Sequence, residues 1–469
     1  MKPNILFIMC DELRAFELGC YGHPAIRTPH IDALAEQGVR FDVGVSSAPV
    51  CQPARAVVLS GQYARTCRGG VNNEAWLPKQ GGWIMPQWPR RGRPELPDPT
   101  LPELLRGHGY HTSAIGKWHA ACWPDDIGFD DYLIPATQHA HSAQWFTQNG
   151  GPVFTPPGFS VDYEADRVCD FLERRRDADE PWFLYYNLSP PHMPLADAPQ
   201  RYLEMYRDDD AVIRGNVDLD TPLENQTSKF LTYLWDYRYY RDGLPYASTL
   251  PDGFDLRRLH AMYMGLTTWV DDKVGQVIAA LDRLGLRDDT VVVFTSDHGD
   301  NLGSHALLGK SQLIEESIRI PFVVRGPNIP AGRVATQVAS LVDVGTTLLS
   351  LAGAPPARHL QGQNLVPVLR GERATLDCNM AFIESSEGCG VRTPTQLLGV
   401  PWAEDRRSLA DRPHRFHDLP QDPWQLDNQV GSAAWARPVR ELEAQLRQWD
   451  QRTPWRPPVE LPPASAGSA

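Results

Sequence analysis

Two adjacent carboxylates, Asp11 and Glu12, stand directly after a short apolar run at residues 4–9. Such a pair repels itself once it is buried, unless a nearby cation neutralises the charge. The pattern therefore predicts a cation-binding site at the end of an early strand. An ordinary acidic turn is the alternative that these two residues leave open.

A cysteine and an arginine stand four positions apart in the segment Cys51-Gln52-Pro53-Ala54-Arg55. We expect a loop to meet a helix here, beginning near Pro53, because proline is well tolerated in the first turn of a helix. A helix N-terminus attracts anionic groups, and Arg55 adds a positive charge one turn further on. The segment predicts an anion-binding site beside the sulfur atom, and a merely reactive or buried thiol is the alternative.

Further polar residues follow apolar runs that we predict to be strands, at residues 111–115, 182–187 and 290–295. These residues are Lys117, His119, His192, Asp297 and His298. Ligands of open α/β sheets bind at the carboxyl ends of the strands. One shared site would explain all of these positions.

The elements that must position these residues alternate between strands and helices. The clearest helix is predicted at residues 256–284, where apolar side chains recur every three or four positions and Gly285 follows as a cap. Another helix is predicted to begin with Thr28 as N-cap and Pro29, and to end at Gly38. The alternation predicts an α/β fold with a large mixed, mostly parallel sheet flanked by helices.

The length of 469 residues favours two domains. After about residue 372 the sequence changes to short segments interrupted by proline and arginine. We predict a large α/β domain over 1–372, a smaller C-terminal α+β domain over 373–453, and a disordered tail over 454–469. The aromatic-rich stretches 76–88 and 235–240 are predicted either to wall a pocket for an apolar or aromatic group or to be packed surface loops.

The formal net charge of -13 argues against nucleic acid as a partner, because phosphate binding needs basic patches. The apolar run at residues 4–9 is too short for a signal peptide or a membrane span, and no later run reaches spanning length. We therefore predict a cytoplasmic protein that does not contact membranes. Eight cysteines without regular spacing predict free thiols rather than disulfides or a zinc site.

The Cys-x-Pro-x-Arg segment, with Leu59-Ser60-Gly61 after it, resembles the signature of the type I, formylglycine-dependent sulfatase family of the alkaline phosphatase superfamily. The resemblance covers most of the chain and implies that residues 1–372 form an alkaline-phosphatase-like catalytic domain. It also implies a transient partner, a formylglycine-generating maturase. This maturase would oxidise Cys51 to 3-oxoalanine (formylglycine), whose hydrate is the nucleophile.

The resemblance also implies one divalent metal ion, with Ca²⁺ as the family default and Mg²⁺ or Mn²⁺ as alternatives. Its implied ligands are Asp11, Glu12, Cys51, Asp297 and His298. Glu12 departs from the family pattern, in which Asp or Gln usually stands at this position. Asp11 is therefore the stronger assignment of the two.

Two further segments, Gly116-Lys117-Trp118-His119 and Pro190-Pro191-His192-Met193-Pro194, resemble the G-K-W-H and P-P-H-x-P motifs of the family. A later Gly309-Lys310 resembles its second G-K pair. The resemblance implies the catalytic residues Cys51, Arg55, Lys117, His119, His192 and Lys310.

The roles that the resemblance implies for these residues differ. Lys117, His192 and Lys310 would bind the substrate, and either His192 or Lys310 would protonate the departing alcohol. His119 would take a proton from the formylglycine hydrate. Asn73 matches a substrate-binding asparagine of choline-sulfatase-like and phosphonate-hydrolase-like relatives.

Together these residues predict an enzyme that hydrolyses a small-molecule sulfate ester, in the manner of an arylsulfatase. One alternative is a phosphonate monoester or phosphodiester hydrolase with the same nucleophile, to which Asn73 and the Asp297-His298 pair also point. Another is a non-catalytic binding protein on the same fold. The alcohol part of the substrate is left open, and so is the oligomeric state, homo-oligomers included.

Overall fold

The computed structural model describes residues 2–73, 92–136, 139–220 and 254–457. The aromatic-rich stretches at 76–88 and 235–240 lie outside these ranges, as do residues 458–469 of the predicted tail. Among the described residues, no helix combines the length and the apolarity needed to cross a bilayer.

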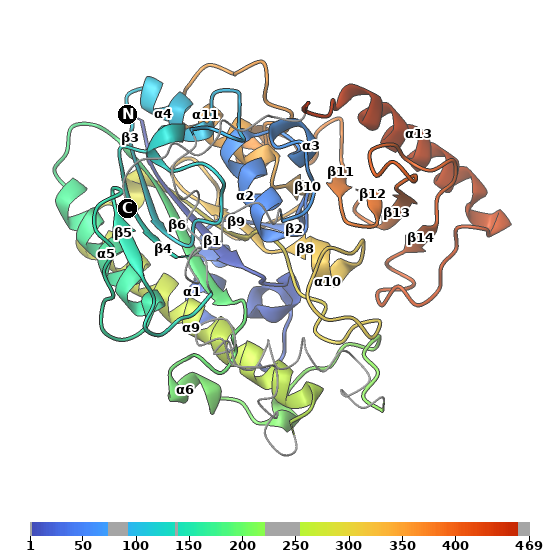
Figure 1. Cartoon of the computed structure of the whole chain (residues 1–469), viewed down its shortest axis with the longest axis horizontal. Coiled ribbons are helices and arrows are strands. Elements are labelled where there is room, and N and C mark those ends of the chain that lie inside the picture. Colours follow the sequence, from blue (N-terminus) through green and yellow to red (C-terminus); the bar gives the residue numbers. More distant parts are fainter. Residues whose placement is uncertain (1, 74–91, 137–138, 221–253, 458–469) are drawn as a thin grey trace, which may run out of the picture.

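A sheet of ten strands runs through the larger part of the molecule (Figure 1). The strands are β1 (Asn4–Asp11), β2 (Val39–Val45), β3 (His111–Gly116), β4 (Asp131–Pro135), β5 (Phe146–Gln148), β6 (Trp182–Pro191), β7 (Thr290–Ser296), β8 (Arg319–Ile320), β9 (Phe322–Arg325) and β10 (Arg333–Ser340). Their order is β10-β2-β9-β7-β1-β6-β3-β4-β5, and β8 pairs with β2. The central run β7-β1-β6-β3-β4 is parallel, whereas β9, β8 and β5 pair antiparallel with their neighbours. The mixed, mostly parallel sheet predicted from the sequence is thus confirmed.

Strand β1 lies at the centre of this sheet and is buried on both faces, as its unbroken apolar run predicts. Parallel pairing with β6 and β7 brings three carboxyl ends to one edge. Cys10 is opposite Ser296, and Asp11 is opposite Pro191. The residues that follow these strands therefore lie next to one another, although they are far apart in the sequence.

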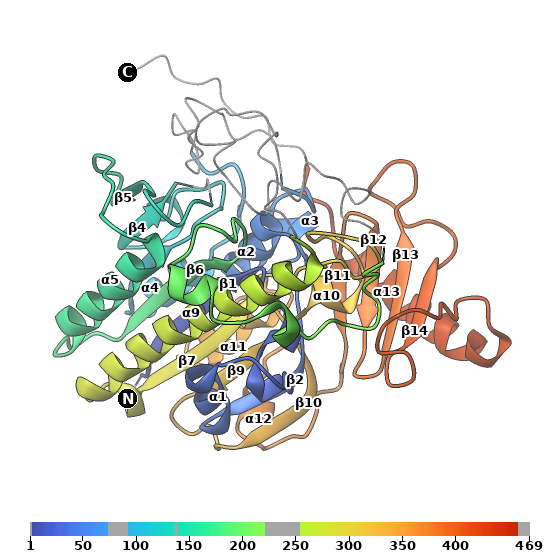
Figure 2. The ribbon, with the colours of Figure 1, turned by 90° about the horizontal axis from the view of Figure 1, so that it is seen from below.

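Helices cover both faces of the sheet (Figures 1 and 2). One face carries α1 (Pro29–Glu36), α5 (Ser160–Arg175) and α9 (Leu256–Arg283), which pack on Leu6 and Ile8 of β1. The other carries α2 (Cys51–Ser60), α4 (Leu101–Gly107) and α11 (Asp343–Leu351), which pack on Ile5 and Phe7. The alternation of side chains along β1 thus supplies two separate apolar cores.

The remaining helices in the described ranges are short, apart from one near the end of the chain. They are α3 (Ala64–Cys67), α6 (Gln200–Leu203), α10 (Glu315–Ile318), α12 (Val366–Leu369) and α13 (Ala436–Arg452), with 3₁₀ turns at Ala15–Glu17, Gly19–Tyr21, Asp125–Ile127, Asp208–Asp210, Arg287–Asp289 and Ala433–Trp435.

The predicted helix at 256–284 is confirmed as α9. It begins where the Asp255 carboxylate accepts the backbone N–H of Arg258 at 3.0 Å, and it ends before Gly285, whose φ is 68°. Helix α1 likewise begins at Pro29, but the Thr28 hydroxyl does not cap it. That hydroxyl accepts the N–H of Gly19 and lies 3.2 Å from Asp32 Oδ1 instead.

A second, antiparallel sheet forms a lobe at one side of the molecule, coloured orange to red in Figure 1. Its strands are β11 (Ala381–Glu384), β12 (Gly388–Arg392), β13 (Gln396–Pro401) and β14 (Arg415–Asp418), and α13 packs against β12 and β13. The predicted smaller C-terminal α+β part is thereby confirmed. The boundary predicted at residue 372 falls between α12 and β11. Within residues 454–457 of the predicted tail, Arg456 donates its backbone N–H to the Arg65 carbonyl at 2.8 Å.

Candidate active site

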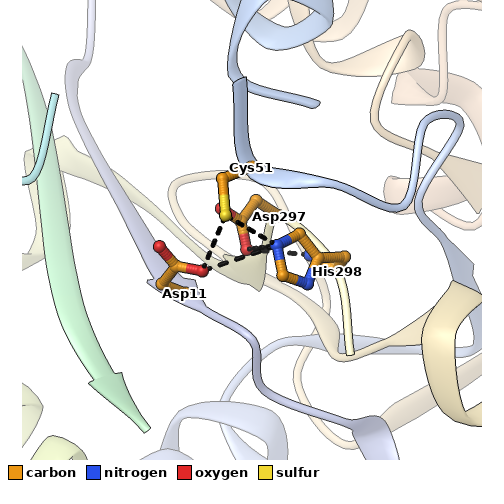
Figure 3. A group of neighbouring side chains, drawn as sticks. All are labelled: Asp11, Cys51, Asp297 and His298. Carbon is orange, nitrogen blue, oxygen red and sulfur yellow. Dashed lines mark hydrogen bonds and ion pairs between the residues drawn. The ribbon is translucent and has the colours of Figure 1, made fainter. Parts of the chain in front are cut away.

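Four side chains converge at the carboxyl edge of the central strands (Figure 3). Asp11 ends β1, Cys51 begins α2, and Asp297 and His298 directly follow β7. One potential ligand atom of each lies within 4.8 Å of the other three, and all four residues are buried. The convergence predicted for residues that follow strands is therefore present for Asp11, Asp297 and His298, and Cys51 joins them from α2.

His298 shows that this group fits a metal ion. Its Nδ1–H donates to the Gly299 carbonyl at 2.8 Å, so the Nε2 lone pair faces the group. Nε2 lies 3.2 Å from Cys51 Sγ and 3.5 Å from one carboxylate oxygen each of Asp11 and Asp297. Burial lowers the pKa of His298 to about 3, which keeps the imidazole neutral. Two carboxylates and a neutral imidazole are a donor set for Ca²⁺, Mg²⁺ or Mn²⁺.

Cys51 is the first residue of α2, two positions before the predicted start of the helix. Burial raises the pKa of its thiol to about 11, so the unmodified side chain is a neutral thiol and a weak nucleophile at pH 7. The predicted substrate-binding Asn73 lies beside it, with its amide oxygen accepting the backbone N–H of Gln52 at 3.0 Å. Asn73 is exposed.

Arg55 lies one turn further along α2 and is completely buried. Its guanidinium donates to Asp297 Oδ2 at 2.9 Å and to Asn187 Oδ1 at 3.0 Å, and it lies 3.4 Å from Asp11 Oδ2. Burial alone would raise the pKa of Asp297, but the neighbouring positive charges, Arg55 among them, outweigh it and hold that pKa below its usual value. Arg55 thus keeps Asp297 ionised and fixes its orientation.

Glu12 turns away from the four-residue group. Its backbone has φ of 69°, and its carboxylate lies 2.8 Å from Lys310 Nζ and 3.3 Å from His192 Nε2. The predicted metal-ligand set is therefore brought together except for Glu12, which instead joins two predicted substrate-binding residues. Burial raises the pKa of Glu12, and the Lys310 ammonium beside it opposes that rise and favours the ionised carboxylate.

The remaining predicted residues gather around a histidine that the sequence analysis did not single out. Lys117 forms an ion pair with Asp11, and its Nζ lies 2.9 Å from Nδ1 of His139. The His139 ring stacks on His192 with centroids 4.0 Å apart. The centroid of His139 also lies 5.9 Å from that of His119, with the two rings inclined at 74°. His139 thus contacts three predicted catalytic residues.

Asn187 and Asp300 were also missed. Asn187 lies within β6 and accepts from Arg55, and Asp300 is buried with its carboxylate accepting the Leu302 N–H at 2.7 Å. Asp300 belongs to the same polar run as Asp297, which is a signal that could have found it. His139 stands in no motif, and only its position in space connects it to the site.

The family model for sulfatases matches residues 3–354, and the model of the N-sulphoglucosamine sulphohydrolase C-terminal region matches residues 303–452. The chain is 27% identical to the ulvan-active sulfatase of Formosa agariphila, with 95% of this chain and 80% of that protein covered. It is 30% identical to the uncharacterized sulfatase YidJ of Escherichia coli, with 90% and 84% covered.

Solved structures share the fold. One is a protein in complex with its substrate D-glucosamine-2-N,6-O-disulfate, with a TM-score of 0.73, 24% identity, and 97% of this chain and 98% of that one covered. Another is the phosphonate monoester hydrolase of Agrobacterium radiobacter, with a TM-score of 0.69, 23% identity, and 97% and 96% covered. The alkaline-phosphatase-like fold is thus confirmed. Since the sulfatase model alone spans well over half of the sequence, this chain belongs to the sulfatase family of the alkaline phosphatase superfamily.

Proposed function

We propose that this sulfatase hydrolyses sulfate monoesters with a formylglycine, made by a maturase from Cys51, as its nucleophile. The observation that carries the proposal is the position of Cys51 Sγ. It lies at the start of α2, 3.6 Å from Asp11 Oδ1 and 3.2 Å from His298 Nε2. A neutral buried thiol is poorly suited to attack sulfur, whereas a hydrated aldehyde offers two hydroxyl groups at the same place.

Asp11, Asp297 and His298 would hold a divalent metal ion next to position 51, with Ca²⁺ as the first choice and Mg²⁺ or Mn²⁺ as alternatives. When bound, the ion would neutralise negative charge on the sulfate oxygens. Arg55 adds positive charge from the protein, and Arg55 and Lys117 both contact Asp11. This excess of positive charge favours an anionic ester.

The proposed reaction uses the protonation states that the site favours. One hydroxyl of the hydrate attacks sulfur and passes its proton to the Asp11 carboxylate, whose Oδ1 lies beside position 51. The bond from sulfur to the alcohol oxygen then breaks. Burial opposes protonation of Lys310, but the neighbouring Glu12 carboxylate acts against it, and the pKa of Lys310 lies above its usual value. This ammonium can therefore protonate the departing alkoxide oxygen.

The second half of the reaction releases sulfate. Burial and the neighbouring Lys117 lower the pKa of His119, so its neutral ring can take the proton of the remaining hydroxyl. The carbon–oxygen bond to sulfate then breaks, and the aldehyde forms again. Water hydrates the aldehyde for the next turnover.

Phosphonate monoester or phosphodiester hydrolysis is the second candidate. Support for it comes from the fold shared with the phosphonate monoester hydrolase and from the Asp297-His298 pair. A non-catalytic binding protein is disfavoured, because every predicted catalytic side chain is retained in or around the site.

The test compares kcat/KM for 4-nitrophenyl sulfate, 4-nitrophenyl phenylphosphonate and 4-nitrophenyl phosphate, on protein produced together with a maturase. We expect kcat/KM to be highest for the sulfate, lower for the phosphonate and lowest for the phosphate dianion. The positive site would bind the dianion tightly, but tight binding of the ground state does not lower the barrier to reaction. A preference for the phosphonate would establish the second candidate instead.

The nucleophile is tested separately by peptide mass spectrometry across position 51, where we expect the aldehyde mass. Cys51→Ala should lose at least about a thousandfold in kcat/KM. Full activity of this variant would refute the mechanism. A cytoplasmic location is part of the proposal, and the eight free cysteines support it.

A further inference from the structure

A pocket of about 320 Å³ lies between the catalytic domain and the C-terminal sheet. The loop after β7 supplies His305, Leu307 and Ile314, and the C-terminal part supplies His414, Arg415 and Gln425, among others. The same loop carries Lys310, which contacts Glu12 in the active site. The volume is in the range of natural ligand sites.

The walls of this pocket are held by hydrogen bonds that do not involve a ligand. Arg415 Nη1 donates to the Leu313 carbonyl at 2.8 Å, and its Nη2 lies 3.4 Å from Glu387 Oε2. The Asn428 side chain donates to the His414 carbonyl at 2.8 Å. The two parts of the chain are thus joined around the pocket, so the pocket is preformed.

Two buried polar atoms in the lining have no hydrogen-bond partner among the described residues. Gln425 is only 5% exposed, and its amide oxygen accepts the Glu315 N–H at 2.7 Å. That bond fixes the orientation of the amide, so the unpartnered atom is the Nε2 donor. The second unpartnered atom is Nδ1 of His414. Unpartnered buried groups of this kind are costly and call for a ligand or water.

The lining carries little net charge. Arg415 and Glu387 compensate each other, and burial lowers the pKa of His414 and of His417 below its usual value, which favours neutral rings. Neutral imidazoles and amides both donate and accept hydrogen bonds. Leu307 and Ile314 add aliphatic surface on the side of the loop. A matching ligand is therefore uncharged, rich in hydroxyl groups, and apolar on one face.

We propose that this pocket binds a neutral pyranose ring, as a subsite for a sugar unit of a sulfated saccharide. Sugar hydroxyls satisfy the Gln425 and His414 atoms, and the C–H face of the ring packs on Leu307 and Ile314. The binding of a sugar in this pocket does not depend on the proposed function. The role of the pocket as a substrate subsite does, because it rests on the proposed hydrolysis of sulfate esters. The loop that carries both Lys310 and the pocket residues supplies that link.

The binding test uses unsulfated methyl galactoside, methyl rhamnoside and N-acetylglucosamine, with glucuronate and inorganic sulfate as anionic probes. We expect at least one neutral sugar to bind with a millimolar Kd by calorimetry, and a crystal soak to place it in the pocket. Leu307→Trp, which fills the pocket, should weaken binding at least about tenfold. Leu426→Trp is the matched control, because Leu426 is 63% exposed and does not line the pocket.

Several results would overturn the proposal: binding of glucuronate or sulfate in place of the neutral sugars, no sugar binding up to about 50 mM, or a sugar located elsewhere. His414→Leu provides a second variant if Leu307→Trp does not fold, and it should weaken sugar binding in the same direction.

The link to catalysis is tested with 4-nitrophenyl sulfate, N-acetylglucosamine 6-sulfate and a disaccharide that ends in the same sulfated sugar. Leu307→Trp should lower kcat/KM for the disaccharide about tenfold and leave 4-nitrophenyl sulfate unchanged. Equal losses on all three substrates would overturn the subsite. Failure of the proposed function has a different signature, namely sugar binding without hydrolysis of any sulfate ester.

Discussion

Glu12 illustrates how one carboxylate beside a metal site can serve a different purpose. Its neighbour Asp11 faces Cys51 and His298, whereas Glu12 faces Lys310 and His192. A carboxylate in that position stabilises a protonated Lys310, which is the proposed acid for the departing alcohol. At the scale of single residues, Glu12 therefore groups with residues that are predicted to bind the substrate.

The metal content of two variants distinguishes a metal-binding role of Glu12 from a role in stabilising protonated Lys310. We expect Glu12→Gln to keep the metal and to lower kcat/KM about tenfold or more, because the charge beside Lys310 is lost. Asp297→Asn should lose the metal, because the Asp297 carboxylate pairs with Arg55 and is one of the proposed metal ligands. Elemental analysis after gel filtration measures both variants. Metal loss in Glu12→Gln equal to that in Asp297→Asn would make Glu12 a ligand after all.

His139 is expected to position the residues that act on the leaving group, because it stacks on His192 and contacts Lys117. Its replacement by Ala should therefore penalise poor leaving groups most. We expect kcat/KM to fall about tenfold more for phenyl sulfate than for 4-nitrophenyl sulfate, which needs little protonation. A steady-state comparison of the two esters checks this. An equal loss on both would indicate a purely structural role.

At the scale of elements, the end of β3 determines where Lys117 lies. Gly116 has φ of 94°, and a Cβ atom there would lie 2.0 Å from the Asn187 carbonyl oxygen. The next residue, Lys117, donates its backbone N–H to that same oxygen at 3.1 Å. Only glycine allows β3 and β6 to approach this closely while the chain turns into the site.

Gly116→Ala should accordingly lower the free energy of unfolding by about 2–4 kcal/mol and abolish most activity, because Lys117 must move. Urea denaturation and kcat/KM measure the two effects. Gly107→Ala is the matched control, since a Cβ atom there meets nothing within 4 Å, and it should stay within about 1 kcal/mol of the wild type. Wild-type activity in Gly116→Ala would contradict this account of the strand end.

At the scale of the whole molecule, buried neutral histidines couple stability to pH. His260 lies on α9, is buried, and donates Nε2–H to the Leu302 carbonyl at 2.8 Å. Burial, reinforced by Arg14, lowers its pKa from 6.5 to about 4. Between these values the unfolded chain binds one more proton than the folded chain. The free energy of unfolding therefore falls as the pH falls from 6.5 toward 4.

His260→Gln removes this contribution, and its amide N–H is expected to keep the bond to Leu302. Between about pH 7.5 and pH 5 the wild type should lose about 2 kcal/mol more stability than the variant, because a proton contributes about 1.4 kcal/mol per pH unit. Urea denaturation at both pH values measures the difference. Parallel losses in the two proteins would show that His260 does not contribute. Other buried histidines are common to both proteins and cancel.

Much of the site could be predicted because its residues either lie close together in the sequence or directly follow a predicted strand. Cys51 and Arg55 are four residues apart on one helix, so they share a face of α2. Asp11, Asp297 and His298 directly follow apolar runs, and parallel strands bring such ends to one edge. The α9 helix was equally predictable, since its periodicity extends over many turns.

The sequence by itself thus determined the family, the α/β class, the convergence of the strand ends and the free thiols. Only the tertiary structure decided that Glu12 faces Lys310, that His139 joins Lys117 and His192, and that a pocket opens beside the C-terminal sheet. The physical reason is distance along the chain. These contacts depend on how separate loops and two lobes pack together, and no local propensity or spacing encodes that packing.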